Sequence, residues 1–169
     1  MTVKTVDALL VGAGAMSTTL AMMLNKLDPT LKICVVERLD QVAHESTDGW
    51  NNAGTGHAAY CELNYTPEDS KGGINISKAL DINASFEVTL QFWSHLVKIG
   101  VLPTPKEFIN RTPHKSFVWG KKNVEFLRKR YELMSAHHLF EDMEFSEDPA
   151  TLTEWMPLVM AGRKGNDPV

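Results

Sequence analysis

The stretch that decides the fold is Val6-Asp7-Ala8-Leu9-Leu10-Val11-Gly12-Ala13-Gly14, a short apolar run that ends in two closely spaced glycines. Residues 16–27 then have a helical pattern, and residues 31–36 form a second apolar run that ends at Glu37. A strand, a glycine turn, a helix and a second strand that ends in an acid are typical, in this order, of a dinucleotide-binding βαβ unit. The sequence therefore predicts an α/β fold that begins with this unit.

The two glycines suit the close approach of a phosphate. A side chain at Gly12 or Gly14 would keep a pyrophosphate away from the backbone N–H groups at the start of the helix. Ser17 replaces the third glycine of the G-x-G-x-x-G pattern. Glu37 stands where such folds place an acid that accepts a hydrogen bond from a ribose. The alternative is a glycine turn in another kind of α/β protein.

A membrane-spanning helix over the uncharged residues 8–24 is a second alternative. That run is slightly short of the ~20 residues that a spanning helix needs. Its glycine and hydroxyl residues also disfavour a spanning helix.

The overall composition is that of an ordinary globular protein, with 43% hydrophobic and 22% charged residues in a chain of 169. The net charge of −4 argues against general nucleic-acid binding. Two cysteines are too few for a disulfide framework, and no metal-ligand spacing is present, so no metal site is predicted. The first five residues lack the layout of a secretory signal, which favours the cytoplasm.

Residues 46–57 are dense in glycine, asparagine and hydroxyl groups, where a dinucleotide dehydrogenase would continue with a helix and a third strand. This composition predicts a long ordered loop whose backbone donors face a ligand. His57 ends the loop. It can take a proton beside a redox ring, and a solvent-facing histidine fits the sequence equally well.

The pattern of residues 77–99 predicts an amphipathic helix that Gly100 ends. The segments 108–109 and 116–119 are interpreted as strands separated by a turn at Pro113. These strands would belong to the part of the chain that follows the nucleotide-binding unit.

A further helix is predicted from an N-cap at Asn123 to about Phe140. Its apolar stripe comprises Val124, Leu127, Tyr131 and Met134. The same region contains a basic run formed by Lys121, Lys122, Arg128, Lys129 and Arg130. We interpret this run as a solvated helix face, the alternative being attraction to an anionic membrane surface or an anionic substrate.

Several segments resemble the malate:quinone oxidoreductases. They are residues 7–17, 49–57, 61–67, 91–93, 113–120 and 154–158. The resemblance runs over essentially the whole chain, and Ser17 is the residue expected in that family. Because the members of the family are much longer, the chain is interpreted as an N-terminal fragment, with some catalytic residues expected beyond Val169.

The resemblance implies an FAD-dependent enzyme of the tricarboxylic acid cycle that oxidises (S)-malate to oxaloacetate and passes electrons to a quinone. It implies a glutathione-reductase-like FAD-binding Rossmann domain over residues 1–100 and the start of an α+β substrate domain over residues 101–169. The expected partners are malate, quinone and the membrane surface. The expected location is cytoplasmic, with peripheral binding to the inner face of the cell membrane.

The residues expected to bind FAD are Gly12, Gly14, Ala15, Met16, Ser17, Glu37, Arg38, Asn51, Asn52, Ala53, Gly54, Thr55 and Gly56. The glycine turn would face the pyrophosphate, Glu37 the adenosine ribose, and residues 51–57 the pyrophosphate and flavin ring. His57 is the candidate catalytic residue. Two alternatives stay open: a soluble flavin oxidase or dehydrogenase of another 2-hydroxy or amino acid, and a non-catalytic nucleotide-binding fragment.

Overall fold

The structure is a computed structural model that describes residues 5–165 and 167–169. The first four residues, on which the expectation about a secretory signal partly rests, lie outside the described residues. The chain forms two compact units, Met1–Thr55 and Gly56–Val169, and each is described by itself. The boundary expected at residue 100 between an FAD-binding and a substrate domain is a functional division and stays a prediction.

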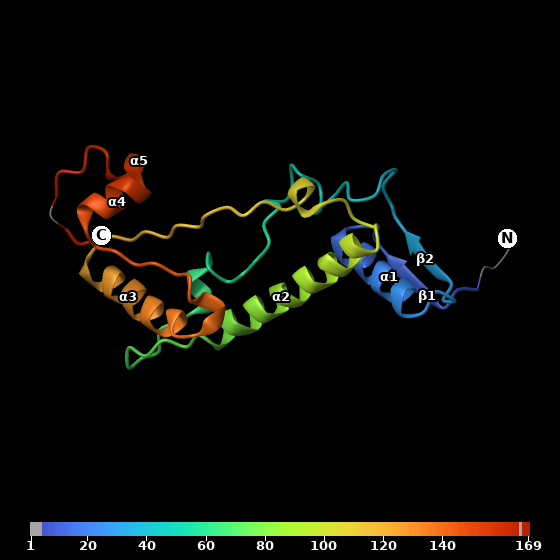
Figure 1. The fold of residues 1–169 in the computed structure, drawn as a ribbon, viewed down its shortest axis with the longest axis horizontal. Coiled ribbons are helices and arrows are strands. Elements are labelled where there is room, and N and C mark those ends of the chain that lie inside the picture. The colour runs from blue at the N-terminus through green and yellow to red at the C-terminus, as the bar shows by residue number, and fades with distance from the viewer. Residues whose placement is uncertain (1–4, 166) are drawn as a thin grey trace. The chain divides into compact units, whose positions relative to one another are not determined.

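The first unit is a βαβ unit, as predicted. Strand β1 (Ala8–Val11) is followed by helix α1 (Ala15–Leu27) and strand β2 (Ile33–Val36). The two strands are parallel, with Ala8 opposite Ile33 and Val11 opposite Val36. Figure 1 shows α1 lying along the pair of strands. A helical crossover is the connection that two adjacent parallel strands require.

The small sheet leaves much apolar surface exposed. Leu9 is 58% exposed and Val11 79% exposed, whereas Ala13, in the turn, is buried. Parallel sheets are usually covered on both faces.

The second unit is almost entirely helical in its regular structure. Its elements are η1 (Leu63–Tyr65), α2 (Ser77–Lys98), η2 (Pro105–Glu107), α3 (Lys121–Ser135), η3 (His138–Phe140), α4 (Pro149–Trp155) and α5 (Pro157–Met160). Gly100 ends α2 as predicted, with φ +74° and a 2.9 Å bond from Val101 N to Leu96 O. Among the described residues, no helix has the length and apolarity needed to cross a membrane.

The core of the second unit joins α2, α3 and η3. Its fully buried apolar residues are Ala59, Ala79, Met134 and Phe140. The ring of Tyr60 packs edge-on against Phe140, with centroids 5.2 Å apart, and its hydroxyl donates to Leu139 O. These contacts hold the segment around residue 60 against the two long helices (Figure 1).

The predicted strands at residues 108–109 and 116–119 are wrong. Phe108 follows η2 directly, and the segment 111–119 is irregular. A strand needs a neighbour with which to form a ladder of hydrogen bonds. Within the described part of the chain, neither segment pairs with another strand. The turn expected at Pro113 therefore has no hairpin to close.

Helix α3 begins and ends earlier than predicted. Its N-cap is Gly120, with φ +88°, and Asn123 lies in the first turn, where its Nδ2 donates to Trp119 O. The helix ends at Ser135, and the 3-10 turn η3 carries the chain on to Phe140. The predicted apolar stripe is confirmed by the burial of Val124 and Met134.

Candidate functional site

The turn between β1 and α1 needs glycine at two positions for different reasons. Gly12 has φ +89°, a left-handed conformation that glycine adopts readily, and its N–H donates to Val36 O at 2.8 Å. Gly14 is the N-cap of α1 with φ −82°, so its backbone tolerates a side chain. A Cβ at Gly14 would nevertheless lie only 3.1 Å from Thr47 Oγ1.

Glu37 is bound to the turn by its own carboxylate. Its Oε2 accepts a 2.7 Å hydrogen bond from Ala13 N, and its Oε1 accepts bonds from the N–H groups of Arg38 (2.6 Å) and Leu39 (3.0 Å). The bonds from Leu39, Ala13 and Arg38 lower the pKa of Glu37 below its ordinary value of 4.5. Since a carboxylate oxygen can accept two hydrogen bonds, Oε2 keeps capacity for one further donor.

The segment after β2 folds back over the glycine turn. Ala43 N donates to Ala13 O at 3.0 Å, and Ala15 N donates to Thr47 Oγ1 at 2.9 Å. The N–H group of Ala15, one of the residues expected to bind FAD, therefore already has a partner. Among the described residues, no acceptor lies opposite the N–H groups of Gly14, Met16 and Ser17. These unpaired donors at a helix N-terminus form a site suited to an anion.

The loop that continues from this segment is irregular, as predicted, and is held by its own asparagines. Asn51 Nδ2 donates to Glu45 O and Asn52 Nδ2 to Ser46 O, each at 3.0 Å. Asn52 Oδ1 accepts a 2.7 Å bond from Gly54 N. Ala53 and Thr55 are exposed. The contact of this loop with a cofactor stays a prediction.

Gly56 and His57 belong to the second unit. A Cβ at Gly56 would lie 2.5 Å from Cε2 of Phe86, so a glycine there lets the chain pass close to α2. His57 is exposed, and its Nδ1 lies 3.8 Å from Cys61 Sγ. The approach of both residues to a flavin ring stays a prediction.

Comparison with known proteins identifies the family. A family model described as malate:quinone oxidoreductase matches residues 4–169. The chain belongs to the malate:quinone oxidoreductase family. It is 70% identical to a probable malate:quinone oxidoreductase of Hahella chejuensis and 63% identical to one of Methylobacillus flagellatus, over 96% of this chain and 33% of each relative. The chain thus spans about a third of the length of the curated relatives it matches.

One member of the basic run of this malate:quinone oxidoreductase segment is not solvated, contrary to the interpretation. Arg130 is only 3% exposed, and its Nε donates to Thr66 Oγ1 at 3.0 Å. Its Nη2 donates to Tyr60 O at 3.1 Å. The sequence contained a signal for this burial, because Arg130 is three residues after Leu127 and four residues before Met134 and so lies on the apolar stripe of the helix.

The rest of the basic run is accessible to solvent. Lys121, Lys122 and Arg128 are exposed, and Lys129 pairs with Glu125 at 3.4 Å. Within the described residues, no group of three or more His, Cys, Asp or Glu side chains is placed to hold a metal ion.

Proposed function

We propose that this chain is the nucleotide-binding part, and the beginning of the substrate part, of an FAD-dependent enzyme. The whole protein would oxidise (S)-malate to oxaloacetate and pass the electrons to a quinone, a step of the tricarboxylic acid cycle. The names of the relatives support the substrate and the acceptor. The observation that carries the nucleotide site is the set of unpaired N–H groups at the start of α1, beside the ionised Glu37.

The donor set of the turn fits the pyrophosphate of FAD. The N–H groups of Gly14, Met16 and Ser17 would bind phosphate oxygens, and the dipole of α1 would add to this attraction. The free acceptor capacity of Glu37 Oε2 would take a ribose hydroxyl. This arrangement supports a glutathione-reductase-like FAD-binding fold. Bound FAD would supply the acceptor for the hydride that leaves malate.

His57 is the proposed proton acceptor for the malate hydroxyl. An imidazole can hold a proton near neutral pH, and His57 is exposed at the end of the glycine-rich loop. Quinones dissolve in the bilayer, so the proposed location is the cytoplasmic face of the cell membrane, with peripheral contact.

The test is a pair of measurements on the full-length protein that contains this segment. Its absorption spectrum should show bound flavin, and malate should drive the reduction of a soluble quinone analogue. Oxygen consumption with peroxide release and no quinone reduction would identify a flavin oxidase instead. Absence of flavin and of turnover would support a non-catalytic nucleotide-binding protein.

A further inference from the structure

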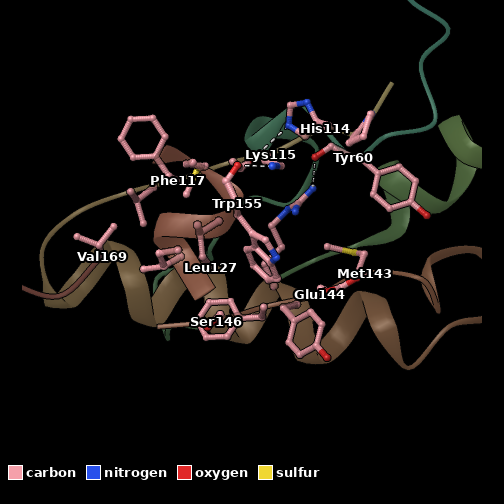
Figure 2. A pocket seen from close by; sticks show the side chains of 18 of the residues that line it. Tyr60, His114, Lys115, Phe117, Leu127, Met143, Glu144, Ser146, Trp155 and Val169 are labelled. Carbon is pink, nitrogen blue, oxygen red and sulfur yellow. Dashed lines mark hydrogen bonds between the residues drawn. The ribbon is translucent and has the colours of Figure 1, made fainter. Parts of the chain in front are cut away.

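The second unit contains a cavity of about 570 Å³ that the proposed FAD site does not use. It is bounded by α3, by the extended segment 111–118 and by the segment 142–146 together with α4 (Figure 2). Leu127, Phe145 and Trp155 give it apolar walls. An apolar wall raises the strength of any charge interaction inside the cavity, because the local dielectric constant is lower than that of water.

A buried cation lies in the wall of this cavity. Arg130 lines it from α3, and in the described structure no carboxylate lies within 4.0 Å of its guanidinium. Its partners are neutral oxygens, those of Thr66, Ala59 and Tyr60, and none of these bonds uses Nη1. Burial lowers the pKa of Arg130. A buried charge is normally paired with an opposite charge, so this guanidinium lacks an anion.

A second cation without a carboxylate partner comes from the extended segment. Lys115 lines the same cavity, and its Nζ donates to Trp155 O at the end of α4 (Figure 2). Lys115 forms no ion pair with any described residue. Its neighbour His114 also lines the cavity, with Nε2 3.0 Å from Ser116 Oγ. Hydrogen-bonding groups thus lie next to Lys115 in the lining.

The cavity has fewer acidic side chains than basic ones. Asp142 already pairs with Arg111 at 3.6 Å, in an exposed ion pair. Glu144 is the other acid in the lining. Arg111, Lys115 and Arg130 line the cavity beside Asp142 and Glu144, so its basic side chains outnumber its acidic side chains.

We propose that this cavity binds the carboxylate groups of a small dicarboxylate, with Arg130 Nη1 and Lys115 Nζ as the anion ligands. The choice of a dicarboxylate rests on the proposed function, since malate carries two carboxylates and a hydroxyl. A guanidinium presents its N–H groups in a planar fork that suits a carboxylate. Ser116 and Tyr131, whose side chains carry hydroxyl groups, also line the cavity. Arg130 and Lys115 are assigned to binding.

The experiment measures the binding of succinate, a dicarboxylate without the oxidisable hydroxyl, to the full-length FAD-loaded protein by isothermal titration calorimetry. Lys115→Gln should raise the Kd about tenfold or more, since it removes a charge-assisted hydrogen bond. Arg130→Lys keeps the charge but loses the fork, and should also raise the Kd. Lys122→Gln, an exposed position of α3 outside the cavity lining, is the matched control and should leave the Kd unchanged.

Unchanged succinate binding in Lys115→Gln would overturn the proposal, even if Arg130→Lys fails to fold. Binding of inorganic phosphate as tight as that of succinate would overturn the assignment to a dicarboxylate. Failure of the proposed function has a different signature. A protein that binds succinate through Lys115 but does not reduce quinone with malate would retain the cavity assignment and lose the proposed activity.

Discussion

The carboxylate of Glu37 accepts a 2.7 Å hydrogen bond from the amide of Ala13, across 24 positions of sequence. This hydrogen bond connects the residue that follows β2 to the glycine turn. The sequence pattern assigns an acid at this position to a ribose hydroxyl alone. In the structure the same carboxylate also holds the glycine turn, so both ends of the proposed nucleotide site would depend on one side chain.

Glu37→Gln is expected to weaken FAD binding to the full-length protein and to lower its melting temperature. Glutamine has one side-chain acceptor oxygen, so it cannot accept from Ala13 and from the Arg38 and Leu39 amides at once. Fluorescence titration with FAD and thermal unfolding measure the two effects. Glu87→Gln, at an exposed position of α2, is the control. Wild-type FAD affinity in Glu37→Gln would refute the ribose assignment.

The lowered pKa of Glu37 makes its contribution to stability depend on pH. The folded-state pKa lies below the ordinary value of 4.5, so the contribution is fully present above that value and is lost as the pH falls through the folded pKa. The difference in melting temperature between wild type and Glu37→Gln should therefore be largest near neutral pH and shrink below pH 4.5. A difference that grows on acidification would contradict the lowered pKa.

Gly14→Val should abolish flavin retention. Its φ of −82° is compatible with valine, so the expected loss comes from crowding against Thr47 and from cover over the unpaired N–H groups. Gly12→Ala is the comparison for the effect on folding stability. Nothing lies within 4 Å of a Cβ added at Gly12, so in the protein without FAD only the φ of +89° disfavours alanine there. We expect it to cost about 1–2 kcal/mol of stability. A Gly14→Val protein saturated with flavin would disprove the phosphate site.

His57→Ala is expected to bind FAD normally and to be reduced slowly by malate. Loss of a general base typically lowers the rate by about 100-fold or more. Stopped-flow absorbance, normalised to bound flavin, measures this rate in the full-length protein. Cys61→Ser, a neighbour whose Sγ lies 3.8 Å from Nδ1, is the control for local structure. An unchanged rate per bound flavin would exclude His57 as the base.

Met134→Ala should reduce the free energy of unfolding by about 2–5 kcal/mol, because Met134 is fully buried in the core of the second unit. Leu133→Ala is the matched control on the same helix, since Leu133 is 44% exposed. Urea unfolding of the full-length protein, followed by circular dichroism, compares the two. Equal losses would show that the apolar stripe of α3 does not face the core.

The βαβ unit was predictable because its parts follow one another in the chain. The spacing of apolar residues, the two glycines and Glu37 each act over short distances. The prediction of strands at residues 108–109 and 116–119 was wrong because strand formation depends on parts of the chain that are distant in sequence. The aromatic and branched residues of the two segments favour strands, but a strand forms only when a distant segment supplies hydrogen-bond partners.

For the candidate site, the sequence pattern selects residues by type, whereas their contacts depend on the fold. The pattern selected Gly12, Gly14 and Glu37 as candidates, and their role in binding FAD stays a prediction. The bond from Ala13 to Glu37 depends on how the turn and the end of β2 come together in space. For Arg130 the residue type was misleading. Its charge favoured a solvated face, while its spacing along α3 placed it with the buried residues.

The contacts of Arg130 also have a kinetic consequence. They join α3 to Ala59, Tyr60 and Thr66 across 64 to 71 positions of sequence, so each closes a long loop of chain. Closing a long loop costs conformational entropy before other contacts compensate for it. The contacts of Arg130 are therefore expected to form late during folding. Loss of these contacts in Arg130→Lys should then accelerate unfolding much more than it slows folding. The contacts of the Arg130 guanidinium would thus slow the unfolding of the second unit and lengthen the time for which it stays folded.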